Sequence, residues 1–165
     1  MKTYTSNGNH QHDQSPPASI YALPRFRVSL VRENRAAAPS LPISTSVTAA
    51  ALIAPCFKGI DREQFVICGL DTKHRIIGLN IVSVGSLTLS IVHPREVFKP
   101  LILMNACAAL CAHNHPSGDP DPSAEDRVLT ARLRQAGELL GITLLDHIIL
   151  GDERTYSFAD QGWPA

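Results

Sequence analysis

The sequence lacks three features that would place it in a special class: a net charge, a long apolar run and a C-x-x-C pair. Fifteen Lys and Arg residues balance fifteen Asp and Glu residues, which argues against a dedicated nucleic-acid-binding protein, because such proteins normally carry a basic excess. No apolar stretch approaches the roughly 20 residues that span a bilayer, and residues 1–17 lack the apolar segment of a secretory signal. The four cysteines lie within apolar stretches, where a free thiol behaves as a small buried hydrophobe. We therefore expect a cytoplasmic protein with reduced thiols.

The composition fits one globular domain preceded by a tail. A chain of 165 residues, 44% hydrophobic and 18% charged, is long enough for a single well-buried core. Residues 1–42 are rich in Ser, Asn, Gln, His and Pro, a composition that buries too little apolar surface to offset the entropy of ordering. We predict a flexible N-terminal tail over residues 1–42 and a folded domain over residues 43–165.

One stretch of the tail, ALPRFRVSLVRE at residues 22–33, alternates polar and apolar residues. This alternation is typical of a strand that joins the edge of a sheet, and its basic residues make the stretch equally a candidate docking arm. Residues 1–60 contain six Lys/Arg and two Asp/Glu. The direct support for association with DNA comes from Arg25, Arg27, Arg32 and Arg35.

From about Ser44 onward, the apolar pattern predicts alternating strands and helices. Helices are expected at 46–57, from His93-Pro94 through about residue 110, and at 123–141. Strands are expected at 64–70, 75–85, 86–93, 109–115, 142–151 and 155–158. Pro100 either kinks the second helix or marks its true start. The order of the elements predicts an α/β fold, a single layered α-β-α domain with a mixed sheet.

The stretch HNHPSGDPDPSAED, which begins at His113, is the strongest indication of a functional site. If residues 109–115 form a strand, His113 and His115 point to the same face, roughly 6–7 Å apart. Two imidazoles so placed can chelate one ion, and a catalytic zinc site usually has three protein ligands and an open position. A turn rich in Pro and Gly leads into the next helix, whose first turn would aim Asp126 back toward the strand's end.

The same residues also have a purely structural interpretation. Ser123 and Asp126 fit a capping box, in which a helix-capping serine and the acidic residue three positions later satisfy each other's backbone N–H groups. Asp119 and Asp121 are possible ligands, but acidic residues in such a Pro/Gly turn are expected to be solvated. Cys111 shares the face of His113 and His115, which would allow a His/Cys site, but a packed cysteine is expected. The pair Asp146-His147 inside an apolar strand needs buried polar partners, and His147 is expected either as a satisfied core histidine or as a partner of a metal ligand.

The spacing His113-x-His115-x7-Ser123-x2-Asp126 is that of the JAMM metalloproteases, and residues from about 58 to 160 resemble the RadC family. The matching stretches are REQFVICGLDTKHRII, VHPREVF, AHNHPSGDPDPS, ED and LLDHIIL. This resemblance implies a JAMM/cytidine-deaminase-like fold and one zinc ion per chain held by His113, His115 and Asp126. Longer RadC-like proteins begin with a segment that resembles helix-hairpin-helix units, and the residues before about 58 show no counterpart.

The resemblance also implies an amide hydrolase and a glutamate upstream of the ligands. Glu63, directly before the strand at 64–70, matches the family's general base, whereas Glu96 is better explained as an acid in the first turn of a helix. Zinc would activate water and polarise the substrate carbonyl, Glu63 would transfer the proton, and Ser123 would hydrogen-bond the oxyanion. The substrate would be a peptide or protein, cleaved at a peptide or isopeptide bond.

Two other functions are weighed against this hydrolase. A zinc nucleobase deaminase also activates water beside a glutamate, but the sequence lacks its H-x-E and P-C-x-x-C signature. A DNA-repair-associated or protein-binding module, whose metal site is structural or unused, remains the alternative, and salt-dependent DNA binding that disappears without residues 1–42 would support it.

Overall fold

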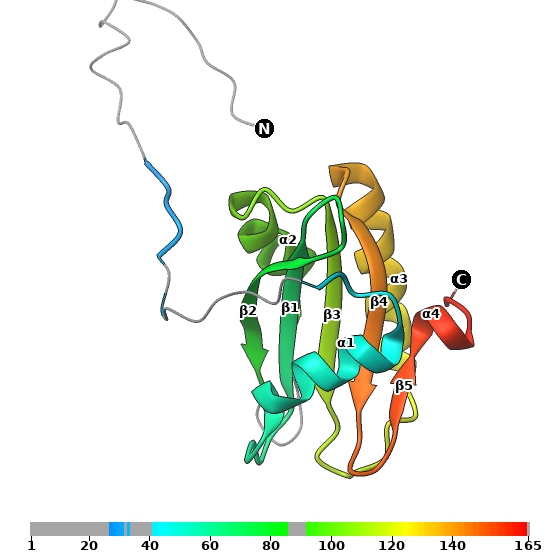
Figure 1. Ribbon diagram of the computed structural model, residues 1–165. Helices are drawn as coiled ribbons and strands as arrows, with labels where there is room; N and C mark the ends of the chain where they lie inside the picture. Colours follow the sequence, from blue (N-terminus) through cyan, green and yellow to red (C-terminus); the bar gives the residue numbers. More distant parts are fainter. Residues whose placement is uncertain (1–26, 32, 34–40, 86–91, 165) are drawn as a thin grey trace, which may run out of the picture.

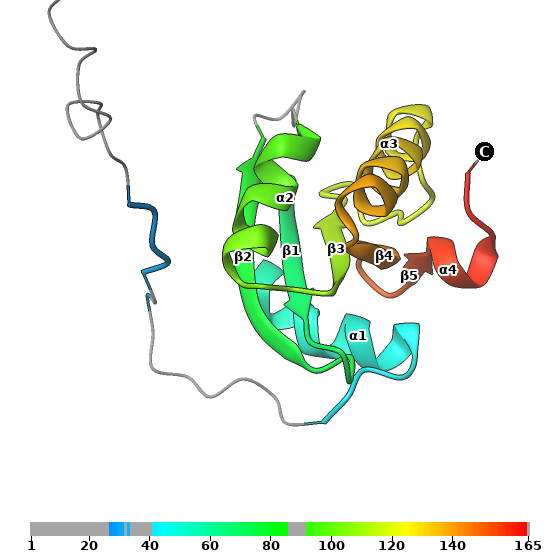
Figure 2. The same ribbon diagram turned by 90° about the horizontal axis from the view of Figure 1, so that it is seen from above.

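The computed structural model describes residues 27–31, 33, 41–85 and 92–164. Within this part of the chain, a five-stranded mixed sheet has helices on both of its faces (Figure 1). Seen from above, α2 and α3 lie on one side of the sheet and α1 lies on the other (Figure 2). The predicted α/β class with a layered α-β-α arrangement is confirmed. Among the described residues, no helix has both the length and the apolar character needed to cross a bilayer.

The strand order in the sheet is β2-β1-β3-β4-β5. The strands are β1 (Gln64–Leu70), β2 (Ile76–Val84), β3 (Ala108–Asn114), β4 (Thr143–Leu150) and β5 (Thr155–Ser157). All pairs are antiparallel except β3 and β4, which are parallel and joined by a crossover through α3. The neighbouring interior strands β1 and β3 are buried along their whole length, which explains why their sequences are largely apolar on both faces.

Four α-helices and one short 3₁₀-helix complete the described part. They are α1 (Ser46–Ile53), η2 (Ala54–Phe57), α2 (Pro94–Leu103), α3 (Ala124–Leu140) and α4 (Phe158–Gln161). One apolar core lies between α1 and the sheet and includes Val66 and Ala112. The second lies between the sheet and α2 and α3, and it includes Cys111 and Leu133. The candidate site develops at the edge of this second core.

The second predicted helix is shorter than expected. The structure ends α2 at Leu103, and Asn105 adopts a left-handed backbone conformation with φ 54°. The N–H of Ala106 then bonds to the carbonyl of Leu101 and closes the helix. The apolar residues that follow join the sheet because β1 and β4 are both available to pair with them. Pro100 lies inside the helix and does not start it.

Two further predictions concern segments that lie largely outside the described residues. The strand predicted at 86–93 lies outside them except for its last two residues, which belong to the connection before α2. In the tail, residues 27–31 and 33 are exposed and are neither helix nor strand. The rest of the predicted edge strand, and most of the tail assigned to residues 1–42, lie outside the described residues.

Candidate metal centre

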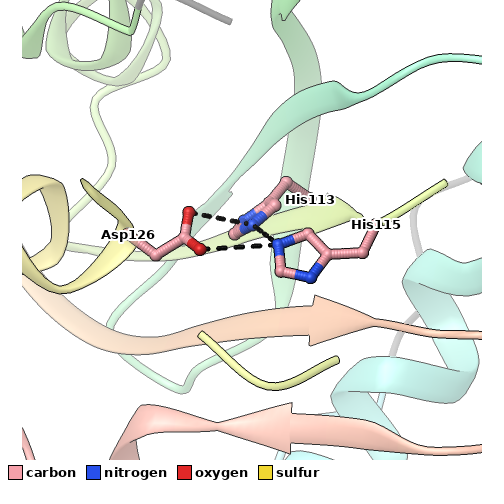
Figure 3. Close-up of side chains that lie close together, drawn as sticks. All are labelled: His113, His115 and Asp126. Carbon is pink, nitrogen blue, oxygen red and sulfur yellow. Dashed lines mark hydrogen bonds and ion pairs between the residues drawn. The ribbon is translucent and has the colours of Figure 1, made fainter. Parts of the chain in front are cut away.

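The end of β3 and the start of α3 bring three candidate ligands together (Figure 3). His113 is the next-to-last residue of β3, His115 directly follows the strand, and Asp126 lies in the first turn of α3. The connecting loop is held against the end of β4. The N–H of Gly118, at φ +83°, bonds to the carbonyl of His115, and the N–H of Asp152 bonds to the carbonyl of Gly118. The predicted approach of strand end and helix start is therefore present.

The spacing of the three donor groups suits a single metal ion. The Nε2 atoms of His113 and His115 are 3.1 Å apart. Nε2 of His113 is 3.2 Å from Oδ1 of Asp126, and Nε2 of His115 is 3.4 Å from Oδ2. In tetrahedral zinc, with bonds of about 2.0–2.1 Å, neighbouring donor atoms lie about 3.3–3.4 Å apart. Two imidazoles and a carboxylate with this geometry fit a zinc-sized ion, so the cluster could bind a metal.

Each imidazole uses its other nitrogen to hold its orientation. Nδ1 of His115 lies 2.7 Å from the carbonyl oxygen of Asp119. Because a carbonyl only accepts, Nδ1 carries a hydrogen and Nε2 is the nitrogen available to a metal. Nδ1 of His113 lies 2.8 Å from Nε2 of His147. His113 is almost completely buried, whereas His115 is partly exposed.

In the metal-free cluster, the pKa values favour a proton on His115 beside an ionised Asp126. Burial alone would raise the pKa of Asp126, but its close contacts with His113, His115 and Ser123 hold it well below its usual range. The pKa of His115 is raised, mainly by its hydrogen bond to Asp126 and against the effect of burial. The carbonyl of Asp119 and the negative charges of Asp126 and Glu63 add to this rise. A proton on His115 therefore occupies the position that a cation would take.

Ser123 is the N-cap of α3, as the capping box predicts. Its hydroxyl accepts the N–H of Asp126 at 3.1 Å and donates to Oδ2 of Asp126 at 2.6 Å. Oδ2 also accepts the backbone N–H of Ser123 at 2.8 Å. The capping interpretation of both residues is confirmed, and the same hydrogen bonds fix the rotamer of Asp126 that faces the two imidazoles.

The two candidate glutamates lie in different environments. Glu63 is half-buried directly before β1, and its carboxylate is close enough for its charge to raise the pKa of His115. Glu96 lies in the first turn of α2, where it is bonded to Lys99 at 2.9 Å and paired with Arg95. The interpretation of Glu96 as a helix acid is confirmed.

The other candidate residues differ in burial: the cysteine is buried, and the two loop aspartates are exposed. Cys111 is fully buried in the core beneath α2 and α3, so the predicted packed cysteine is confirmed. Burial strongly raises the pKa of its thiol. Asp121 is exposed, and the Asp119 carboxylate forms an exposed ion pair with Arg154 at 3.3 Å. The backbone carbonyl of Asp119, which holds His115, could not be identified from residue type.

Asp146 and His147 satisfy both of the predicted possibilities. They are buried, and all of their polar groups have partners. The Asp146 carboxylate accepts from the N–H groups of His147 and Ala159 and from the hydroxyl of Ser157. His147 is a satisfied core histidine, and its partner is the candidate ligand His113.

Comparison with known proteins shows the family of this chain. Residues 43–163 match the family described as "RadC-like JAB domain". A UPF0758 protein of Methanosarcina mazei is 41% identical over 157 residues, which are 95% of this chain and 66% of that protein. A UPF0758 protein of Shouchella clausii is 49% identical over 121 residues, 73% of this chain and 53% of the relative. The chain thus spans about half to two thirds of the length of these relatives. It belongs to the family of RadC-like JAB domains.

Proposed function

We propose that this chain is a zinc-dependent hydrolase of amide bonds in peptides or isopeptides, with one zinc ion per chain. The observation that carries the proposal is the convergence of two Nε2 atoms and one carboxylate at tetrahedral spacing. Three protein ligands with the fourth position open are typical of catalytic zinc sites, whereas structural sites have four. Membership of the RadC-like JAB domain family supports the same function.

In this proposal Glu63 is the general base. Zinc, when bound, lowers the pKa of a water molecule toward about 7 and polarises the scissile carbonyl. Glu63 accepts a proton from the attacking water and returns it to the leaving amine, a role worth roughly 10²–10⁴-fold in rate. The effect of its charge on the pKa of His115 supports this assignment, because the Coulomb effect of a charge on an imidazole falls off with distance.

Ser123 has a second proposed role, as a hydrogen-bond donor to the oxyanion that forms on the substrate. Its hydroxyl hydrogen is directed to Oδ2 of Asp126. The proposed role therefore requires this hydrogen to turn from Asp126 to the substrate oxygen during the reaction. The backbone N–H of Ser123 stays on Oδ2 of Asp126 in either case and keeps the carboxylate in place.

A peptide or protein substrate in the cytoplasm completes the proposal. Association with DNA through the basic residues of the tail belongs to the alternative, a binding module whose metal site is structural or unused. Of these residues, the structure describes Arg27 alone, and Arg27 lies in an exposed stretch. The two functions differ in one measurable property, since a binding module needs no Glu63.

The first experiment measures metal content by mass spectrometry after the purified chain has been offered zinc. We expect about one zinc per chain, retained by His93→Ala and lost by His115→Ala. His93 is a suitable control because it is an exposed histidine outside the cluster that makes no side-chain capping bond. A folded wild-type chain without zinc would overturn the hydrolase proposal.

The second experiment measures cleavage of a mixed-sequence, fluorescence-quenched peptide library and of peptides joined through a lysine isopeptide bond. Glu63→Gln should keep zinc and lose cleavage, whereas Asp61→Asn should keep both, because Asp61 is exposed and its side chain contacts Arg62. Zinc-dependent cleavage that survives in Glu63→Gln would contradict the assigned base. Full zinc binding without cleavage of any probe would favour the binding module.

A further inference from the structure

A buried chain of hydrogen bonds connects two of the three candidate ligands. It runs from Nδ1 of His113 to Nε2 of His147 at 2.8 Å, and from Nδ1 of His147 to Oγ1 of Thr130 at 2.6 Å. Oγ1 of Thr130 lies 2.6 Å from the backbone carbonyl oxygen of Asp126. His147 and Thr130 have no exposed surface, and His113 is 1% exposed. Water therefore does not compete for these groups, and their hydrogen bonds must be satisfied within the chain.

The carbonyl at the end of the chain decides the direction of every hydrogen bond in it. A carbonyl oxygen only accepts, so the single hydroxyl hydrogen of Thr130 goes to Asp126. Thr130 then accepts a hydrogen from Nδ1 of His147. A neutral imidazole with its hydrogen on Nδ1 has a bare Nε2, which accepts the hydrogen on Nδ1 of His113. His113 in turn presents a bare Nε2 to the cluster.

The surroundings of His147 support its neutral form. Its ring lies between Phe65 and Phe158, with ring centroids 5.3 Å away on each side. His147 is completely buried, and its two ring nitrogens each have one hydrogen-bond partner, Thr130 and His113. A neutral His147 has one donor and one acceptor nitrogen, which is what the position between Thr130 and His113 requires.

We propose that His147 and Thr130 are positioning residues of the metal centre, which fix the tautomer of His113 so that its Nε2 is free to bind a divalent cation. The inference deepens the proposed function and rests on its metal-binding part. Neither residue touches the metal position. They act through His113, and Thr130 also links the chain to the backbone of Asp126, so that the ring of one ligand is held relative to the helix that carries the other.

The alternative is a chain of the opposite direction. If Thr130 donated to His147, then His147 would donate to Nδ1 of His113, and the hydrogen of His113 would lie on Nε2. That hydrogen would point to Asp126, 3.2 Å away, and would block the metal. The two directions differ in the tautomers of His113 and His147, which can be measured directly.

The first test is the tautomer of each histidine in the metal-free wild-type chain, read from long-range ¹H–¹⁵N correlation spectra at a pH well above the usual histidine pKa. We expect the hydrogen on Nδ1 in both His113 and His147. A hydrogen on Nε2 of His113 would overturn the inference. This reading needs no substitution, so it does not depend on whether a variant folds.

The second test is the zinc affinity of Thr130 variants, measured by competition with a chelating dye. Thr130→Val keeps the shape and removes the hydroxyl, whereas Thr130→Ser keeps the hydroxyl. Loss of an outer partner of a metal-ligating histidine typically costs about 10–100-fold in metal affinity, so we expect a loss of this size in Thr130→Val and in His147→Phe, and wild-type affinity in Thr130→Ser. A Thr130→Val chain that folds and binds zinc like the wild type would contradict the proposed role, because a merely structural hydroxyl changes stability and not affinity.

These results separate this inference from the proposed function. A wild-type protein with the expected tautomers that binds no zinc would overturn both the proposed zinc hydrolase and the metal-positioning role of His147 and Thr130. Zinc binding by a chain whose His113 carries its hydrogen on Nε2 would overturn this inference alone.

Discussion

The side chain of Asn114, which lies between the two histidine ligands in sequence, accepts the backbone N–H of Gln64 at 2.8 Å. Its amide nitrogen also donates to the backbone carbonyl of Arg62 at 3.0 Å. The two bonds reach the residues immediately before and after Glu63. Asn114 points to the face opposite its histidine neighbours, because side chains alternate along a strand. One strand end thus carries the candidate ligands on one face and fastens the backbone of the candidate base on the other.

These two hydrogen bonds predict that Asn114→Ala lowers the stability of the chain. The substitution leaves the N–H of Gln64 without its partner, and Gln64 is 4% exposed, so we expect a loss of about 1–3 kcal/mol in the free energy of unfolding. Denaturant unfolding of the zinc-free chain measures it. Because the side chain faces away from the cluster, zinc stoichiometry should not change, and a chain that loses its zinc on this substitution would contradict the assigned geometry.

The capping box makes a separate prediction about Ser123→Ala. The hydroxyl accepts the N–H of Asp126 and donates to its carboxylate, and loss of an N-cap costs typically about 1 kcal/mol. We expect that loss in thermal or denaturant unfolding, together with weaker zinc binding because the rotamer of Asp126 is less well held. Ser117→Ala, in the same loop and outside the box, is the matched control. Unchanged stability in Ser123→Ala would argue against the cap.

The raised pKa of His115 predicts how zinc binding depends on pH. In the metal-free chain this pKa lies above the ordinary value of 6.5 because His115 donates to Asp126. Zinc must displace that proton, so apparent affinity should be constant above the raised pKa and should fall about tenfold per pH unit below it. Calorimetry in buffers of different ionisation enthalpy would show one proton released below the pKa and none above it.

The raised pKa of His115 also makes the stability of the metal-free chain depend on pH, in the direction opposite to zinc affinity. Since the folded pKa of His115 exceeds the unfolded value of 6.5, its pairing with Asp126 contributes stability that is complete below 6.5 and is lost as pH rises through the folded pKa. The stabilisation that added zinc provides should therefore grow over this window. A zinc effect that shrinks as pH rises through it would contradict the pairing.

The close approach of the loop to the end of β4 predicts a strong effect of Gly151→Ala. A Cβ at Gly151 would overlap the carbonyl oxygen of Gly118 and lie 2.8 Å from Cδ of Pro120. Both atoms belong to the loop whose Asp119 carbonyl holds His115. We expect a destabilisation of about 1–3 kcal/mol from overpacking and weaker zinc binding. In Gly78→Ala the new Cβ meets the flexible side chain of Met104 far from the site, so zinc affinity should stay at the wild-type value.

Interactions between residues close in sequence allowed part of the fold and of the site to be predicted from the sequence. The alternation of a strand places His113 and His115 on one face, and the first turn of a helix places Ser123 and Asp126 in a capping box. The apolar runs and the turn residues predicted strands at 64–70 and 142–151, and the structure contains them at Gln64–Leu70 and Thr143–Leu150. In each case the controlling interactions join residues a few positions apart, so that residue type and spacing carry the information.

The tertiary structure decided where the polar residues of β4 point. The register between β3 and β4 shifts between Ala109 and Leu110, whose partners are Leu144 and Asp146. One extra residue in β4 exchanges the faces of all residues that follow, so His147 lies on the face of His113 and Asp146 on the other. Without the shift, the carboxylate would lie beside His113. No pattern along the chain marks such an insertion, because it is set by pairing with a strand more than 30 residues away.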